Sequence, residues 1–323
     1  MENGLLFDVD DYKKIRVIID TDAACEADDP FAIVHALLSP KLIVKGIVAE
    51  HFNCEGSVER SFAEIENILY AMDTDEEQEN AKWMNVPHFM GESGPLRSLG
   101  GVYESDAVKF IIDEALQQDS HPLYILCQGA VTNLAAAFLR APEIVSRVNV
   151  IWIGTHGEMN EIPYREFNAG NDVEAANIVL SSGVNLSLVP STVYSTINIG
   201  MAELQCEVYP CGNIGKHLFE QMVRYNNSKE AEWTKGESWS LGDSPAVAIA
   251  LNPWCGHYKE IVAPIIRQDT SSSFENGDSR NLQENAADEA EKSIRPKITI
   301  YTDVDSRYIL GDMIAKIRLF TGE

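Results

Sequence analysis

Residues 15–36 constrain the fold more than any other stretch of this sequence. They open with an apolar, β-branched run, Ile15-Arg16-Val17-Ile18-Ile19, that ends at Asp20. Pro30 then begins a segment whose apolar residues follow helical spacing. A short apolar run of this kind indicates a buried parallel strand, and proline is favoured in the first turn of a helix. The stretch therefore predicts a strand, a loop at the carboxyl end of that strand, and a helix.

The loop between this strand and this helix is strongly acidic. Its carboxyl groups belong to Asp20, Asp22, Glu26, Asp28 and Asp29. Carboxylates this close together repel one another unless some are protonated or a cation neutralises them. A hard divalent cation with oxygen ligands is the simplest solution. The alternative is that Asp28 or Asp29 only caps the helix and complements its dipole, but a cap requires one acid rather than five.

Short apolar runs alternate with helical patterns along most of the chain. Strands are expected at 42–49, 123–127, 148–154, 184–190 and 296–302, and helices at 57–72, 104–116 and 306–320. Such alternation predicts an α/β fold with an open, mostly parallel sheet that helices cover on both faces. We expect one domain over residues 1–323. Residues 268–295 have almost no bulky apolar side chains, and we interpret them as a mobile loop or an insertion.

The charge of the chain limits its partners. Fifty acidic residues against 25 Lys and Arg give a net charge of −25, which argues against nucleic acid and against anionic membranes. A small neutral ligand remains compatible.

The six cysteines form no CxxC pair, so neither a zinc site nor a redox motif is indicated. With no signal peptide and no apolar run of spanning length, we expect a cytoplasmic protein. Cys25 is interpreted as a bystander in the acidic loop, because its anionic neighbours oppose a thiolate.

Ligands of open parallel sheets lie at the carboxyl ends of the strands. Four segments of this chain reach that edge: the acidic loop, the turn at Gln128, the residues after Ile153, and the turn Gly242-Asp243. Asp243 precedes Ser244-Pro245, so it is also expected to occupy the N-cap of a helix. A cap position and a role in a binding site are compatible with each other.

The residues at these strand ends resemble a known family. The motifs, in chain order, are Asp20-Thr21-Asp22 with Asp28-Asp29, Gly91 to Leu96, Gly129 to Leu134, Asn160 with Glu166-Phe167-Asn168, and Asp243-Ser244-Pro245. Together they are similar to the nucleoside hydrolases, the inosine- and uridine-preferring N-ribohydrolases. The resemblance runs from about Ile15 to Leu251.

This resemblance implies a site and a reaction. Ca²⁺ would be bound by Asp22, Asp29, Asp243 and the main-chain carbonyl of Gln128. The bound water would attack the anomeric carbon of a ribosyl compound, with Asp22 as general base, through an oxocarbenium-like state. Ribose hydroxyls would be held by Asp28, Asn160, Glu166 and Asn168. The family is commonly dimeric or tetrameric, so a homodimer or homotetramer is expected.

The sequence departs from the family pattern in ways that bear on catalysis. Five residues separate Asp22 from Asp28, where the common signature has three, and Gly242 occupies the position at which many members have a His that protonates the leaving base. A family asparagine that binds the sugar falls near His51 and Asn53. We therefore interpret His51 as the first candidate to contact the ligand, as a donor to a sugar hydroxyl or as an acid. Asn53 and His156 are further candidates for ligand binding.

Two other functions compete with a nucleoside hydrolase. A sugar- or nucleoside-binding relative could have kept the metal and lost efficient turnover, and the missing His before Asp243 favours this reading. A phosphatase of the haloacid dehalogenase type also has Asp-x-Asp after its first strand. That mechanism requires a later Lys and a distant acidic pair, whereas here the acidic pair lies in the same loop.

Overall fold

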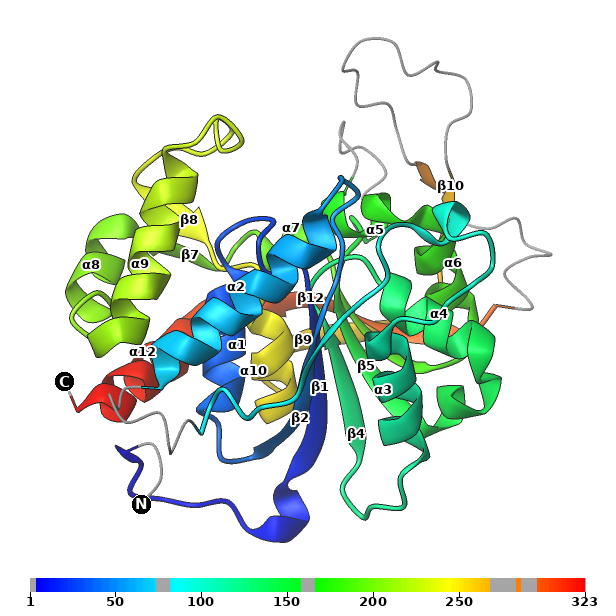
Figure 1. Ribbon diagram of the computed structural model, residues 1–323, viewed down its shortest axis with the longest axis horizontal. Helices are drawn as coiled ribbons and strands as arrows, with labels where there is room; N and C mark the ends of the chain where they lie inside the picture. Colours follow the sequence, from blue (N-terminus) through cyan, green and yellow to red (C-terminus); the bar gives the residue numbers. More distant parts are fainter. Residues whose placement is uncertain (1–3, 74–81, 158–165, 268–282, 286–294, 323) are drawn as a thin grey trace.

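A large parallel sheet forms the centre of the protein (Figure 1). The computed structural model describes residues 4–73, 82–157, 166–267, 283–285 and 295–322. The eight strands of this sheet lie in the order β3-β2-β1-β4-β5-β6-β12-β9, and only the β12–β9 pair is antiparallel. Their bounds are β1 Ile15–Thr21, β2 Leu42–Ala49, β3 His88–Met90, β4 Leu123–Cys127, β5 Val148–Ile153, β6 Asn185–Val189, β9 Gly256–Val262 and β12 Lys297–Val304. This arrangement confirms the predicted fold class.

Helices cover both faces of the sheet. Strand β1 shows why, because Val17 and Ile19 are buried in one hydrophobic core and Ile18 in the other. Helices α1 Asp29–Leu37, α2 Ser57–Met72, α9 Gly212–Asn226, α10 Ser244–Leu251 and α12 Ser306–Thr321 contribute to the first core. Helices α3 Asp106–Leu116, α4 Thr132–Arg140 and α6 Val173–Ser181 contribute to the second. In Figure 1 the two sets lie on opposite sides of the strands.

The predicted elements agree closely with those observed. Strands β2 and β4 and helix α2 have the predicted bounds, and the other predicted strands and helices differ by one or two residues at their ends. Strand β9 is an element for which the sequence gives no clear signal, since most of its side chains are exposed and it carries Lys259 and Glu260. It forms the antiparallel edge of the sheet, where a strand does not need a continuous apolar run.

Smaller elements surround the main sheet. Strands β7 Asn198–Gly200 and β8 Ser238–Ser240 form one antiparallel pair, and β10 Ile265–Arg267 pairs with β11 Gln283–Asn285 in another. Strand β11 falls within the segment interpreted as a loop or an insertion, and the rest of 268–294 lies outside the described residues. The short helices are α5 Phe167–Asn171, α7 Ser191–Tyr194 and α8 Met201–Glu207, with 3₁₀ turns at Asp11–Lys13, Leu96–Ser98 and Pro142–Arg147. In the described part of the chain, every helix is too short or too polar to cross a bilayer.

The carboxyl ends of the central strands converge on one edge. Strand β1 leads to Asp22, β4 to Gln128 and β5 to Gly154, and the parallel register places these ends side by side. The main-chain N–H of Gln128 donates to the carbonyl of Asp20 at 2.8 Å, which fixes the β4 turn against the acidic loop. A ligand site at this edge is what a parallel sheet of this kind favours.

Candidate active site

A pocket opens at this edge of the sheet. It encloses about 380 Å³ of empty space, part of which is open to solvent. Its lining residues come from the ends of several strands and from the starts of several helices: Asp22, Cys25, Glu26, Asp28, Asp29, Gln128, Ile153, Phe167, Asn168, Tyr194, Gly242 and Asp243. The pocket therefore gathers residues that are more than two hundred positions apart in the chain.

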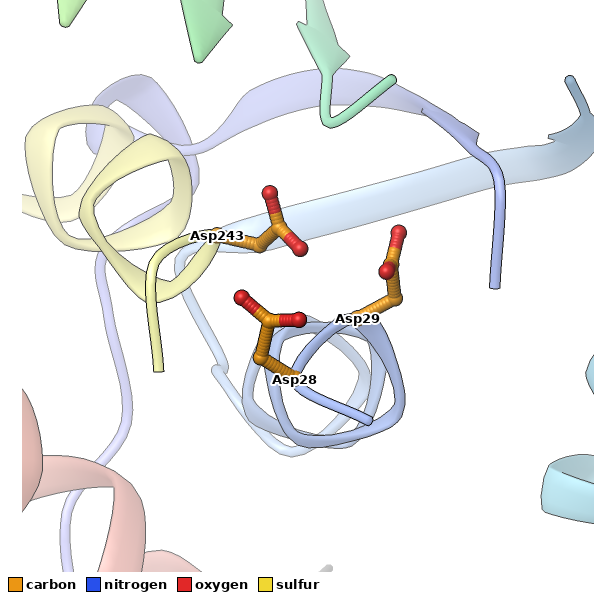
Figure 2. A group of neighbouring side chains, drawn as sticks. All are labelled: Asp28, Asp29 and Asp243. Atoms are coloured by element: carbon orange, nitrogen blue, oxygen red, sulfur yellow. The ribbon is translucent and has the colours of Figure 1, made fainter. Parts of the chain in front are cut away.

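Three buried carboxylates form the centre of the lining. Asp28, Asp29 and Asp243 each offer an oxygen atom, and these atoms all lie within 4.8 Å of one another. Figure 2 shows the three side chains converging from the start of α1 and from the turn before α10. Carboxylate oxygens at such spacing are a suitable ligand set for a hard divalent cation.

Two carboxylates of the cluster stand at helix N-cap positions but form no capping hydrogen bond. Asp28 and Asp243 occupy the N-cap positions of α1 and α10, and each helix has proline in its first turn. Neither side chain accepts a hydrogen bond from its own helix. Instead, Asp28 accepts one from the main-chain N–H of Gly242 at 2.8 Å. The alternative that Asp28 only caps α1 is therefore wrong. Asp243 does occupy the predicted N-cap position of α10, but its side chain forms no cap bond and lines the pocket.

Asp22 lies beside this cluster. The residue is 3% exposed, and its Oδ2 atom has no hydrogen-bond partner among the described residues. Gly129 allows the turn after β4 to approach, since a Cβ atom on Gly129 would lie only 2.8 Å from the Asp22 carboxyl group. A buried carboxylate oxygen without a partner is costly unless a proton or a cation satisfies it.

The electrostatics of the pocket point to a missing positive charge. Burial and repulsion by neighbouring acids raise the pKa of Asp22 and of Asp243 well above the usual range. Burial also raises the pKa of Asp28 to about 6, and burial together with Asp28 raises that of Asp29 to about 7. Burial, Asp28 and Asp29 raise the pKa of Glu26 to about 8. No Lys, Arg or His is found among the described residues that line the pocket. The donor set, the orphaned Asp22 oxygen and this unbalanced charge all fit a divalent cation.

Gln128 and Asn168 line the same pocket as the acids. The Asn168 Nδ2 group donates to the carbonyl of Ile153 at 2.9 Å and to that of Gln128 at 3.3 Å. The Gln128 side chain is buried, and neither of its polar atoms has a partner in the part of the chain described here. The carbonyl of Gln128 is thus held at the lining, where it can supply one further oxygen.

Glu166 supports Asn168 from behind the pocket. Its carboxylate accepts hydrogen bonds from the main-chain N–H groups of Thr155, Asn168 and Ala169, and from the hydroxyl of Tyr194 at 2.9 Å. Glu166 is buried and is not a lining residue. The geometry therefore gives it a positioning role for the loop. Asn160, the other predicted ribose ligand of this region, lies outside the described residues.

The structure does not bring His51 or Asn53 to the pocket. His51 is fully buried, its Nδ1 atom accepts from the N–H of Asn53, and its Nε2 atom lies 2.8 Å from the hydroxyl of Thr132. Thr132 in turn donates to Asp172. Burial lowers the pKa of His51 to about 4, although Asp172 opposes this shift. The Asn53 side chain is exposed, and its backbone has a φ of 53°. This geometry favours a structural role for His51.

His156 is also outside the lining. It is 5% exposed, and its Nδ1 atom lies 2.6 Å from the hydroxyl of Ser191. Its neighbour Thr155 has a φ of 65°, and the Thr155 hydroxyl accepts from the N–H of Gly157 at 3.0 Å. These contacts brace the turn after β5. The prediction that His156 binds ligand has no support in this geometry.

Some lining residues were not assigned a role from the sequence. Phe167 is 46% exposed at the pocket, and Tyr194 contributes the hydroxyl that holds Glu166. For Glu26, the sequence indicates only a place among the acids of the loop. Burial and the acids around Cys25 raise the pKa of its thiol well above the usual value, which agrees with its interpretation as a bystander. The position of Phe167 between Glu166 and Asn168 was the available signal for it.

Comparison with known proteins places these features in a family. The model for the inosine-uridine preferring nucleoside hydrolases matches residues 17–311. An uncharacterized protein of Schizosaccharomyces pombe is 30% identical over 265 residues, which are 74% of this chain and 81% of that protein. The pyrimidine-specific ribonucleoside hydrolase RihB of Escherichia coli is 26% identical over 75% of this chain and 80% of its own length.

Solved structures share the fold. A purine-preferring ribonucleoside hydrolase from Gardnerella vaginalis superposes with a TM-score of 0.73 at 20% identity, over 95% of this chain and all of that one. A plant nucleoside hydrolase superposes with a TM-score of 0.71 at 20% identity, over 96% and 99% of the two chains. The eight-stranded sheet and its helices are therefore the architecture of these enzymes.

Proposed function

Because this chain belongs to the inosine-uridine preferring nucleoside hydrolase family, whose members are hydrolases of N-glycosyl compounds, we propose that it cleaves the N-glycosidic bond of a ribonucleoside in the pocket between Asp22 and Asp243, with Ca²⁺ as cofactor. The observation that carries the proposal is the cluster of buried carboxylates without a balancing cation among the described lining residues.

The residues that would hold the ion are chosen by donor type and position. Asp29 and Asp243 are in the convergent cluster, and Asp22 and the carbonyl of Gln128 line the same pocket. Asp28 already accepts from Gly242, so we assign it to ribose hydroxyls, which its remaining oxygen can bind. Carboxylates and a carbonyl are the oxygen ligands that Ca²⁺ prefers. When bound, the ion would lower the pKa of a water molecule and so supply the nucleophile.

The chain's own residues would carry the other steps. Asp22 would accept the proton of the attacking water as general base. The nearby carboxylates would stabilise the positive charge that develops on the sugar ring as the C–N bond breaks. Asn168 donates to two carbonyls through Nδ2, which leaves its Oδ1 atom to accept from a ribose hydroxyl.

The proposal is tested by release of reducing sugar from a panel of ribonucleosides, measured in chelator and again after Ca²⁺ is restored. We expect release that chelator abolishes and Ca²⁺ recovers, whereas Mg²⁺ should recover less because it demands a smaller octahedral site. Phosphate release from a generic phosphoester would support the phosphatase alternative. Stabilisation by ribose with no product over hours would support the binding-protein alternative.

A further inference from the structure

The base that leaves in this reaction ordinarily requires a proton, and the residue before Asp243 cannot supply one. When the C–N bond of a neutral nucleoside breaks, the electron pair stays on the base, which departs as an anion unless it receives a proton. Gly242 stands directly before Asp243 and has no side chain that could donate one. Within the described lining, the ionisable groups are carboxyls, the Cys25 thiol and the Tyr194 phenol. An anionic base would leave into a strongly negative environment.

The same environment favours a positive charge on the ligand. Five carboxyl groups line the pocket, and a divalent cation balances fewer than half of them. Glu26 is the lining acid to which the proposed function assigns neither the metal nor a ribose hydroxyl. It makes no hydrogen bond and no ion pair with any described residue, and it lies outside the cluster of Asp28, Asp29 and Asp243. Its carboxyl group is therefore available to a bound ligand, and a cation placed beside it favours the ionised form.

Aromatic side chains accompany Glu26. After burial, the charge of Glu26 is the main cause that raises the pKa of Tyr225, and Glu26 also acts on Tyr194 behind burial and Glu166. Both phenols thus lie within electrostatic range of this carboxylate. Of the aromatic residues near Glu26, Tyr194 and Phe167 line the pocket, and Phe167 is half exposed there. Aromatic faces and carboxylates together are the chemistry that binds flat organic cations.

From this arrangement we propose that the pocket selects N-ribosides whose base already carries a positive charge, such as N-ribosylpyridinium compounds, and that Glu26 provides this selectivity. The inference rests on the proposed function, because it names the substrate class of that reaction. The bond from the anomeric carbon to the ring nitrogen breaks, and its electron pair neutralises the ring charge. Water forms the new C–O bond and loses one proton to Asp22, which then releases it to solvent. The products are ribose, a neutral pyridine and a proton, so the leaving group requires no acid.

The decisive experiment measures binding without turnover. A pyridine C-riboside and its N-methylpyridinium derivative have a C–C glycosidic bond that cannot be hydrolysed, and they differ in charge. Their dissociation constants are measured by calorimetry on the Ca²⁺-loaded protein. We expect the cationic probe to bind about tenfold tighter or more, since close charges at low effective dielectric interact by that much. In Glu26→Gln the preference should fall about tenfold, and in Glu26→Asp it should persist. Glu55→Gln, at an exposed acid after β2, is the matched control and should keep it.

A hydrolysis assay on an N-ribosylpyridinium compound and on uridine runs in parallel. A higher kcat/KM for the cationic substrate, which Glu26→Gln reduces, supports the inference. Equal binding of the two C-ribosides, or a preference that Glu26→Gln leaves intact, overturns it. If no N-riboside is hydrolysed while the charge preference in binding holds, the proposed function fails and the selectivity of the pocket stands.

Discussion

The carboxylate of Asp28 accepts a hydrogen bond from the main-chain N–H of Gly242 at 2.8 Å, although 214 positions separate the two residues. This bond joins the acidic loop after β1 to the turn before α10. The turn then holds Asp243 against Asp29, so the convergence of the carboxylates depends on it. Asp28 stands at the N-cap of α1 without capping it, which leaves its side chain for this contact.

Substitution of Asp28 should show how much this contact stabilises the protein. Asp28→Ala leaves the buried N–H of Gly242 without an acceptor, which costs about 1–3 kcal/mol. Asp28→Asn keeps an oxygen that can accept the bond. Both variants remove the same negative charge, so the difference between them isolates the hydrogen bond. We expect Asp28→Ala to have a lower free energy of unfolding in urea than Asp28→Asn, at equal Ca²⁺. Equal free energies of unfolding would show that this hydrogen bond does not stabilise the protein.

Asp243 can be tested as a metal ligand with Asp305, an N-cap residue outside the pocket lining, as the matched control. Both are N-cap residues, but the Asp305 side chain accepts from Tyr308 N–H, whereas that of Asp243 makes no cap bond. Asp305→Ala should cost about 1 kcal/mol of stability and leave Ca²⁺ affinity unchanged. Asp243→Ala should lower Ca²⁺ affinity by at least about tenfold. Equilibrium dialysis and urea denaturation measure the two effects. Ca²⁺ binding that survives in Asp243→Ala would contradict the assigned site.

The chelated protein should lose stability as the pH rises. Burial raises the folded-state pKa of Asp28 to about 6, and burial and neighbouring acids raise those of Asp29 to about 7 and of Glu26 to about 8. Their unfolded values are about 4. Groups with a raised folded pKa contribute stability that is fully present below the unfolded pKa and is lost as the pH rises through the folded pKa. The loss should therefore fall between about pH 4 and pH 8.

The measurement is the thermal midpoint with chelator and with Ca²⁺ at each pH. Groups remote from the cluster, such as His35, titrate alike in both samples and cancel in the difference. Ca²⁺ should stabilise the protein little near pH 5 and most near pH 8, because ionised carboxylates bind it better. If the difference in thermal midpoint between the Ca²⁺ and chelator samples becomes smaller toward pH 8, the cluster does not bind a cation.

Much of the fold could be predicted because buried parallel strands have continuous apolar sequences. Residues 15–21 and 42–49 carry this signal locally, and so does Pro30 at the start of α1. The exposed edge strand β9 has no such signal. Among the lining residues, the position of Asp22, Asp29 and Asp243 could be predicted because acids directly after strands or before helices gather at one edge of the sheet. The fit of Gly129 against Asp22 is a contact between distant segments, which no local pattern encodes.

The strand-end rule also has a limit, which His51 and Glu26 illustrate. A residue after a strand reaches the correct edge, but the direction of its side chain depends on tertiary packing. The ring of His51 turns toward Thr132 on α4, away from the lining, while Glu26 faces the pocket from the longer loop. Tyr194 lies in a short helix with no motif of its own. Such placements follow from contacts between elements rather than from spacing.

His51 should act on stability and not on the reaction. Its pKa of about 4, lowered by burial, keeps the ring neutral at physiological pH, and Thr132 and Asn53 engage its nitrogens. His51→Gln should cost about 1–3 kcal/mol in urea denaturation, because a buried hydrogen-bond network is disturbed. The shape of the pH profile of kcat/KM should not change. Loss of one limb of that profile at unchanged stability would restore His51 as a catalytic acid.

Asp22 is the residue on which the proposed chemistry depends most. Its Oδ2 atom has no partner among the described residues, and Gly129 leaves room for it at the pocket. Asp22→Asn keeps the size of the side chain and removes both the base and one negative charge. We expect kcat to fall by about 10²–10⁴, the range for loss of a positioned general base.

The stability of the same variant should move in the opposite direction. Burial and repulsion by Asp29, Asp28 and Glu26 raise the pKa of Asp22 well above its usual range, so at pH 8 its ionised form destabilises the chelated protein. Asp22→Asn should therefore melt at a higher temperature than wild type in chelator at pH 8, and the two should differ little near pH 4. A slow enzyme that is also more stable excludes misfolding as the cause of the lost turnover. Normal turnover in Asp22→Asn would refute the role of this residue as the base, whatever its effect on stability.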